Sequence, residues 1–274
     1  MDVKTIHLAD GTEVPRLGFG TFQLAGEDAY RSVAVALETG YRHVDTAQGY
    51  GNEAEVGRAV AGSGIDRSEV FLATKLKPSN AAAKDVRAST QDSLRELGTD
   101  HVDLLLLHWP AEDVAPLAET LEAMTTLQQD GLTRLIGVSN FPSKMLARAY
   151  ELAPIVTDQV EHHPYLGVDK IEEVLRVRDG FLTAYSPLAR GTVVNDETLQ
   201  AIAADHDATP AQVTLRWMLQ RPGIVAIPKS GTPERIRSNF EVDGFALSDE
   251  EMARIDGLER GERHIDPGFA PDWD

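Results

Sequence analysis

Eight short apolar runs, separated by longer amphipathic stretches, constrain the fold more than any other feature of this sequence. The runs are residues 17–20, 41–45, 70–75, 102–108, 134–140, 155–161, 181–187 and 224–230. Most are apolar along nearly their whole length, which is typical of parallel strands that are covered on both faces. The alternation therefore predicts a chain of the α/β class, in which strands and helices follow one another.

The stretches between the runs carry helix signals. Residues 27–39 have apolar positions at helical spacing, and Gly40 follows them as a typical helix end. Residues 209–220 begin with Thr209-Pro210, an N-cap residue before a proline at the first helical position. Further helix starts are predicted at Thr232-Pro233 and at Ser248 with Glu251.

Eight units of strand and helix in 274 residues predict a closed (β/α)8 barrel, the TIM barrel. An open doubly wound sheet is the alternative, but no G-x-G-x-x-G pattern follows the first run. Extended residues on both sides of Asp10-Gly11 predict an N-terminal β-hairpin. No linker or repeat divides the chain, so we expect residues 1–274 to form a single domain.

Polar residues stand where the predicted strands end. In chain order they are Gly20-Thr21, Asp45, Lys75, His108, Ser139-Asn140, Gln159, Tyr185-Ser186 and Lys229-Ser230. The C-terminal ends of all barrel strands meet at one face, which is where active sites of this fold lie. The sequence therefore predicts a functional site on that face.

The charge of the chain excludes some function classes. A net charge of −18 repels polyanions, so no nucleic-acid partner is expected. Only 7 of the 26 basic residues are lysine, a composition compatible with a high-salt habitat and equally with an ordinary acidic surface. No apolar run is long enough to span a membrane and no signal peptide is evident, so we expect a cytoplasmic protein. Without heptads or an apolar stripe, a monomer is the default expectation.

Seven segments, in order, resemble the characteristic segments of the aldo-keto reductase family. They are HVDTAQGYGNE (43–53), ATK (73–75), LLHWP (106–110), GVSNF (137–141), QVEHHPY (159–165), AYSPLARG (184–191) and IPKSGTPERI (227–236). The runs TFQLAGEDA and HWP are similar to those of the shorter prokaryotic members related to diketogluconate reductases. This resemblance covers nearly the whole chain and implies an oxidoreductase that reduces carbonyl groups with a nicotinamide cofactor.

The resemblance implies four catalytic residues, Asp45, Tyr50, Lys75 and His108. Tyr50 would donate the proton, and Lys75 held by Asp45 would lower the pKa of Tyr50 from its usual value of about 10. His108 would polarise the carbonyl oxygen through a ring N–H. Each residue also has a structural alternative: an ion pair of Asp45 with Lys75, a surface position for Tyr50 and a core position for His108.

The resemblance also implies the cofactor site. Ser139, Asn140 and Gln159 would hold the nicotinamide carboxamide, and Tyr185 would stack on the nicotinamide ring. Other contacts are expected from Gly20, Thr21, Phe22 and Asp45 near the nicotinamide, and from Ser186, Pro187, Leu188, Arg190 and Gly191 along the pyrophosphate.

The segment 229–239 carries the signal for NADP(H). A helix start with a lysine, a hydroxyl and an arginine favours a phosphate group. The resemblance implies that the adenosine 2′-phosphate is held here by Lys229, Ser230, Gly231, Thr232, Arg235 and Asn239. Ser238 stands where related proteins often have glutamate, so the preference for NADPH over NADH is expected to be less strict. The structural alternative is a solvated surface loop.

The substrate side is expected to be aromatic. Phe22 and Trp109, together with Ala47 and Gln48, would wall it, while Tyr50 and His108 would face the substrate. The C-terminal stretch 261–274 is expected to fold over the edge of the pocket. No metal site is predicted at His162-His163, because adjacent strand residues face opposite ways and no third ligand is evident.

The leading functional hypothesis is the reversible, NADPH-dependent reduction of aldehydes and ketones, with a small carbonyl compound as substrate. Two alternatives stay open. One is a Schiff-base aldolase with Lys75 as its amine. The other is an NADPH-binding sensor subunit on the same fold, because a fold does not determine a function.

Overall fold

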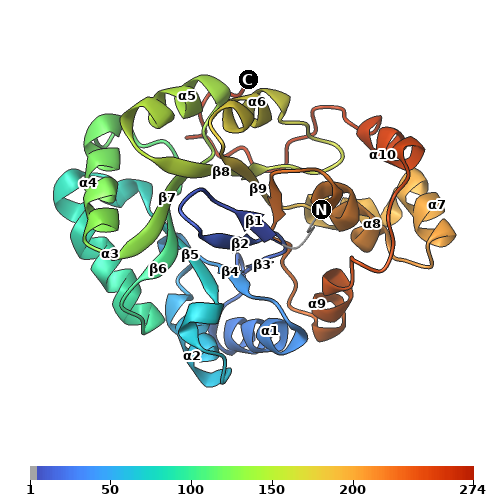
Figure 1. The fold of residues 1–274 in the computed structure, drawn as a ribbon, viewed down its shortest axis with the longest axis horizontal. Helices are drawn as coiled ribbons and strands as arrows, with labels where there is room; N and C mark the ends of the chain where they lie inside the picture. Colours follow the sequence, from blue (N-terminus) through green and yellow to red (C-terminus); the bar gives the residue numbers. More distant parts are fainter. Residues whose placement is uncertain (1–4) are drawn as a thin grey trace.

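An eight-stranded parallel sheet forms the centre of the computed structural model, which describes residues 5–274 (Figure 1). Its strands pair with one another in chain order. They are β3 (Phe19–Gly20), β4 (His43–Asp45), β5 (Phe71–Leu76), β6 (Val102–Leu107), β7 (Thr133–Ser139), β8 (Ile155–Glu161), β9 (Phe181–Tyr185) and β10 (Ile224–Ala226). Each corresponds to one of the eight apolar runs.

The first and last strands close the sheet into a barrel. Leu17 forms a parallel bridge with Ala226, and the N–H groups of Gly18 and Gly20 donate to Ala226 O and Pro228 O at 2.9 and 3.0 Å. Both glycines are required by the close approach, since a Cβ on Gly20 would lie 2.9 Å from Ile227 O. The predicted TIM barrel is therefore confirmed.

Ten α-helices of the described chain surround the sheet (Figure 1). They are α1 (Gly26–Thr39), α2 (Glu53–Gly62), α3 (Ala83–Leu97), α4 (Leu117–Gln129), α5 (Ser143–Leu152), α6 (Asp169–Val177), α7 (Glu197–Asp205), α8 (Pro210–Gln220), α9 (Pro233–Phe240) and α10 (Asp249–Asp256). The helix starts predicted at Thr209 and Ser248 are confirmed, and both have a capping box, which had been predicted only at Ser248. At α9 the Thr232 side chain makes no capping hydrogen bond within residues 5–274, although Thr232 is the N-cap residue.

None of the helices within residues 5–274 is both long enough and apolar enough to cross a lipid bilayer.

Two apolar layers explain why most strand residues are apolar. In β6, Leu104 and Leu106 point into the barrel and pack with residues such as Phe71 and Val225, whereas Leu105 and Leu107 belong to the layer between strands and helices. Successive residues of a strand face opposite sides, so a strand buried on both faces is apolar at most of its positions.

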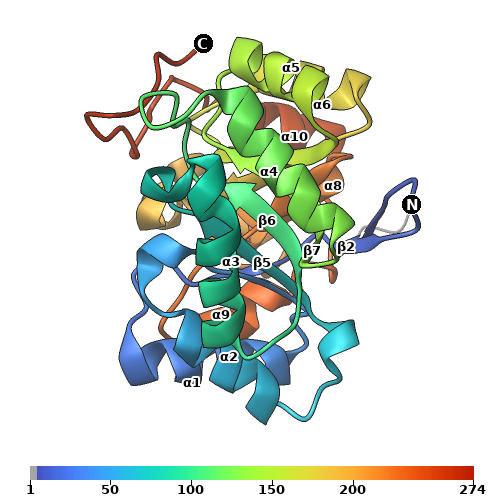
Figure 2. The same ribbon diagram turned by 90° about the vertical axis from the view of Figure 1, so that its left-hand side faces the viewer.

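The N-terminal hairpin covers one end of the barrel. Strands β1 (Thr5–His7) and β2 (Glu13–Pro15) pair antiparallel around a turn in which Gly11 has φ +86°. Val14 is fully buried against the residues that fill the barrel. Figure 2 shows the hairpin and the C-terminal segment on opposite sides of the molecule. The hairpin leaves the C-terminal ends of the strands uncovered.

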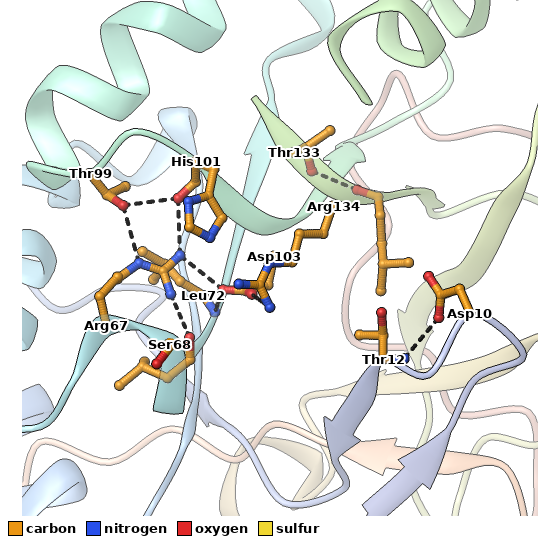
Figure 3. A network of polar contacts seen from close by, with 12 residues as sticks. Asp10, Thr12, Arg67, Ser68, Leu72, Thr99, His101, Asp103, Thr133 and Arg134 are labelled. Carbon is orange, nitrogen blue, oxygen red and sulfur yellow. Dashed lines mark hydrogen bonds and ion pairs between the residues drawn. The ribbon is translucent and has the colours of Figure 1, made fainter. Parts of the chain in front are cut away.

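A polar network lies at this N-terminal end, centred on Asp103, the second residue of β6 (Figure 3). Asp103 is buried, accepts the Leu72 N–H at 2.9 Å, and pairs with Arg67 at 2.9 Å and with Arg134 at 3.4 Å. Arg67 also donates to the carbonyl oxygens of Val70 and His101. The network joins β5, β6 and β7 at the N-terminal end of the barrel.

Candidate active site

A cavity of about 1260 Å³ lies at the C-terminal ends of the strands. Most residues predicted from the sequence line it: Gly20, Phe22, Asp45, Tyr50, His108, Trp109, Ser139, Asn140, Gln159, Tyr185, Ser186, Pro187, Leu188, Arg190, Gly191, Lys229, Ser230, Arg235 and Asn239. Thr21, Lys75, Gly231 and Thr232 are not among the described residues that line it. Thr21 and Lys75 are fully buried behind its wall, and Gly231 and Thr232 are exposed beside it.

Lys75 connects Asp45 to Tyr50. Its Nζ lies 2.5 Å from Asp45 Oδ1 and 3.3 Å from Tyr50 Oη, and it also donates to Thr46 O at 2.8 Å. Asp45 and Lys75 come from the ends of the adjacent strands β4 and β5 and are almost completely buried. With three oxygen partners around it, the amine has one defined position, from which it contacts the phenol.

A short turn brings Tyr50 to this position. The 3₁₀ turn Gln48–Tyr50 follows β4, and the chain just after the turn is fixed by hydrogen bonds of the buried Asn52. Asn52 Nδ2 donates to two backbone carbonyls of segment 21–24, at 3.0 and 2.9 Å, and Asn52 Oδ1 accepts from Thr46 Oγ1 at 2.7 Å. The sequence indicated no role for Asn52, because the two carbonyls to which it donates belong to the preceding strand–helix unit.

Burial determines the protonation of Tyr50. Burial, reinforced by the carboxylate of Asp45, raises the pKa of Tyr50 well above its ordinary value. The lowered pKa predicted for Tyr50 from the sequence was therefore wrong. The charge of Lys75 is partly balanced by Asp45 at 2.5 Å, so its attraction for a phenolate does not offset the burial of Tyr50. Burial also lowers the pKa of Lys75, against the opposing effect of Asp45.

His108 follows β6 and faces the same cavity. Burial, and after it the charge of Lys75, lowers the pKa of His108 to about 3, so the imidazole is neutral near pH 7. Its ring lies 5.6 Å from that of Tyr50, centre to centre, and Asn140 Nδ2 donates to His108 O at 3.0 Å. A neutral imidazole carries one ring N–H, which can donate to a carbonyl oxygen.

The three residues predicted to hold a carboxamide form one hydrogen-bond network. Ser139 Oγ donates to Gln159 O at 2.7 Å, and Gln159 Nε2 donates to Asp45 Oδ2 at 2.8 Å. Asn140 has φ +65°, and its Oδ1 accepts from the Tyr185 hydroxyl at 2.8 Å. The network fixes these side chains at the ends of β7, β8 and β9, beside the Asp45 carboxylate.

The wall formed by residues 186–191 has unusual backbone geometry. Ser186, Ala189 and Arg190 all have positive φ, between 46° and 54°, and Gly191 has φ +97°. A Cβ on Gly191 would meet no atom of the described chain within 4 Å, so lack of space within the protein does not require glycine there. Its conformation, rather than a lack of space, favours glycine.

Comparison with known proteins identifies the family. The model of the aldo/keto reductase family matches residues 16–260. The chain belongs to this family. An aldo-keto reductase of Mycobacterium sp. (strain KMS) is 43% identical over 266 residues, which is 96% of each chain.

Solved structures agree with this assignment. A candidate 2,5-diketo-D-gluconic acid reductase B superposes with a TM-score of 0.94 at 45% identity, over 97% of this chain and 96% of that one. The aldose reductase of Schistosoma japonicum has a TM-score of 0.90 at 32% identity, over 95% and 94% of the two chains. As an aldo-keto reductase, the chain is an oxidoreductase acting on carbonyl groups, and members of this family typically use nicotinamide cofactors.

The volume of this aldo-keto reductase cavity leaves room for more than one small molecule. Ligand pockets for drug-sized molecules measure about 300–1,000 Å³, and this cavity is larger. It extends from Asp45 and Tyr50 to Arg235 and Asn239 on α9. Its far end also includes Thr209, Pro210 and Ala211, to which the sequence had given no place in the site, and Ser238, which stands where related proteins often have glutamate.

The substrate side is aromatic, but its composition differs from the prediction. Phe22 is 48% exposed and contacts the Tyr50 ring. The centre of the Trp109 ring lies 5.3 Å from that of Phe269 and 6.2 Å from that of Trp273. The prediction for Ala47 and Gln48 was wrong, since neither is among the described residues that line the cavity. Ala47 is fully buried, and Gln48 bonds to α3 instead, through Ser89 O and Ser93 Oγ.

The C-terminal segment folds over the edge of the cavity, as expected. It contributes His264, Ile265, Asp266, Pro267 and Phe269 to the lining. The N–H groups of His264 and Ile265 donate to the carboxylate of Glu161 at the end of β8, at 2.9 to 3.2 Å. Which of these residues lie at the cavity could not be read from the sequence, because segment 261–274 has no periodicity.

Proposed function

We propose that this aldo-keto reductase reduces aldehydes and ketones with NADPH and that Tyr50 donates the proton. One observation carries the proposal: the Tyr50 hydroxyl contacts Lys75 Nζ at 3.3 Å and borders the cavity together with the neutral imidazole of His108. A phenol, an amine and an imidazole at one wall are the groups that a carbonyl reduction needs besides a hydride donor.

The proposed roles follow from the charges of these side chains. A bound nicotinamide would supply the hydride. The His108 N–H would stabilise the negative charge that develops on the carbonyl oxygen. The Tyr50 hydroxyl, which the raised pKa keeps protonated, would give its proton to that oxygen and complete the alcohol. The phenolate left behind would lie 3.3 Å from Lys75 Nζ, where an ammonium stabilises it.

Preference for NADPH is supported by the far end of the cavity. Lys229, Ser230 and Arg235 line it there, at the start of α9, and both basic side chains are exposed. Two cations and a hydroxyl beside a helix N-terminus suit a phosphate group. Ser238 in the same lining offers no charge, so we propose a preference for NADPH that still permits NADH.

The test is NADPH consumption with a reactive aromatic aldehyde, in low and high salt, for the parent enzyme and Tyr50→Phe. Loss of the proton donor should reduce turnover by about 10²–10⁴-fold, while binding of NADPH, followed by fluorescence quenching, is retained. Turnover unchanged in Tyr50→Phe would remove Tyr50 from this role. Absence of turnover in the parent enzyme, with NADPH still bound, would favour a sensor subunit.

Arg235→Gln tests the cofactor preference separately. It should raise the KM for NADPH by about tenfold and leave the KM for NADH nearly unchanged, because only NADPH carries the 2′-phosphate. Equal changes for both cofactors would place Arg235 elsewhere on the nucleotide.

No finding supports the aldolase or sensor alternatives. For the aldolase, Lys75 Nζ is fully buried and already engaged with three oxygen atoms, and it is not among the described residues that line the cavity. A monomer with a cytoplasmic location stays a prediction.

A further inference from the structure

Glu161, His163 and His264 form a second cluster of potential ligands beside the active site. Each offers one ligand atom, and these atoms all lie within 4.8 Å of one another. Glu161 and His163 are fully buried, and the His264 side chain is 21% exposed at the edge of the cavity. The proposed carbonyl reduction uses none of these side chains.

Strand geometry explains how the first two residues meet. Glu161 ends β8, and His163 follows two residues later in a segment that bridges to Leu166. Residues i and i+2 of an extended chain point to the same side. The alternation that separates His162 from His163 therefore places His163 with Glu161, and their Nε2 and Oε1 atoms are 3.2 Å apart.

The third residue comes from a segment about 100 residues away along the chain. Glu161 accepts the backbone N–H of His264 at 3.0 Å, which brings the His264 ring to 5.2 Å from the ring of His163, centre to centre. The sequence analysis predicted no metal site because it found no third ligand near His162-His163. The fold supplies two more candidate ligands, Glu161 and His264.

Both histidines have an unused ring nitrogen. Among the described residues, Nδ1 of His163 and Nε2 of His264 are buried without a hydrogen-bond partner, although His264 Nε2 lies 3.3 Å from the Glu262 carboxylate. Buried polar atoms normally have partners, and an exception requires an explanation such as an ion. The positive charge of Arg263 interacts with Glu161 and opposes the binding of a cation there. The Arg263 guanidinium, however, stacks on the Trp273 ring, 3.6 Å from the ring centre.

We propose that Glu161, His163 and His264 bind one divalent transition-metal ion of the zinc class. Two imidazoles and one carboxylate are an established ligand set for Zn²⁺, with a water molecule as the fourth ligand. Ligands of one zinc ion lie about 3–4 Å apart, so the cluster needs only a small movement of the partly exposed His264 ring. The ion would join β8 to the segment that forms one wall of the cavity.

The experiment is calorimetric titration of the untagged, EDTA-treated enzyme with ZnCl₂, together with the visible absorption spectrum of the Co²⁺-loaded enzyme. We expect one ion per chain with a micromolar Kd. His264→Ala should weaken binding at least tenfold and abolish the Co²⁺ bands. This variant keeps the backbone N–H that bonds to Glu161, so the segment stays attached.

His206→Ala is the matched control. His206 is 20% exposed and pairs with a carboxylate, Glu251, at 2.7 Å, but it has no second histidine beside it among the described residues. It should bind Zn²⁺ like the parent enzyme. His163→Gln provides a second variant with the same expected loss as His264→Ala. Binding that is absent in the parent enzyme, or unchanged in both His264→Ala and His163→Gln, would overturn the proposal and leave the cluster as a hydrogen-bonded clamp.

Discussion

Both ends of the barrel hold a buried carboxylate paired with a cation. At the C-terminal end Asp45 pairs with Lys75, and at the N-terminal end Asp103 pairs with Arg67. The Asp45 and Asp103 side chains are only 2% and 5% exposed, so both pairs have lost most of their hydration. The two pairs differ in the type of cation, lysine or arginine, and in what that cation contacts besides the carboxylate.

At the N-terminal end, the network is directed into the protein. Arg67 also donates hydrogen bonds to the carbonyl oxygens of Val70 and His101 and to the Thr99 hydroxyl, so the network joins neighbouring strands (Figure 3). At the C-terminal end, Lys75 also contacts the hydroxyl of Tyr50, which borders the cavity. In TIM barrels the C-terminal end is where function lies, and the N-terminal end serves stability.

The two cations also respond differently to the loss of their partner. A buried lysine can release its proton, and the pKa of Lys75 is already lowered by burial. An arginine side chain, by contrast, keeps its charge in proteins. Removing the carboxylate should therefore damage chemistry at one end and stability at the other.

Asp45→Asn should cause the largest effect on activity. Without the carboxylate, Lys75 loses the opposite charge and the hydrogen bond that favour its charged form and hold it beside Tyr50, so kcat should fall by about 10²-fold or more. The unfolding free energy should change less than for the corresponding variant at the other end. Steady-state kinetics and urea unfolding of the same preparation measure both. Activity within a factor of three of the parent enzyme would contradict the assignment of the pair to catalysis.

Asp103→Asn is the matched substitution at the N-terminal end. It leaves Arg67 and Arg134 without a counter-charge, which should lower the unfolding free energy by about 3 kcal/mol. The kcat should stay close to that of the parent enzyme, because the network lies at the opposite end of the barrel from the candidate active site. A shift of the urea midpoint with unchanged slope measures the loss. If Asp103→Asn lost activity at full stability, the contrast between the two ends would be wrong.

The sequence predicted the C-terminal end better than the N-terminal end, for a physical reason. Strand periodicity determines where strands end, and parallel strands end at one face, so Asp45, Lys75 and His108 could be grouped without a structure. The depth at which Tyr50 is buried could not be predicted, which is why its pKa was assigned the wrong direction. Asp103 lies inside an apolar run, and nothing in the sequence pairs it with Arg67, 36 positions earlier.

The contribution of the C-terminal segment was equally hidden. Its outline was expected from the proline-rich sequence, but its attachment depends on Glu161, 103 residues before His264. Glu161 stands at a strand end like the predicted site residues, yet its partners are backbone N–H groups of an irregular segment. Such groups exist in every residue and leave no sequence signal.

Acid should destabilise the protein, in part through His108 at the C-terminal end. Its folded pKa is about 3, against about 6.5 in the unfolded chain. Between these values the unfolded chain binds a proton that the folded protein does not, so stability falls as pH decreases from 6.5 towards 3. From pH 6.5 to pH 4 this group contributes about 3 kcal/mol of that loss. His108→Gln should flatten the pH dependence of the urea midpoint, whereas an unchanged acid profile would contradict it.

Arg67→Gln should cost more stability than Arg134→Gln. Arg67 is 23% exposed and makes four contacts, with Asp103, Thr99, Val70 O and His101 O, so its loss leaves buried acceptors without donors and should cost about 2 kcal/mol. Urea midpoints of the two variants compare the losses directly.

Arg134→Gln should have the smallest effect of all. The Arg134 side chain is 46% exposed and lies 3.4 Å from Asp103, a geometry in which ion pairs contribute about 0–1 kcal/mol. Because Asp103 keeps Arg67 and the Leu72 N–H, its charge stays compensated. The small loss should shrink further in 1 M NaCl, where exposed charges are screened. A loss as large as that of Arg67→Gln would mean that Asp103 needs both arginines, so that charge rather than hydrogen bonding to the backbone stabilises this end of the barrel.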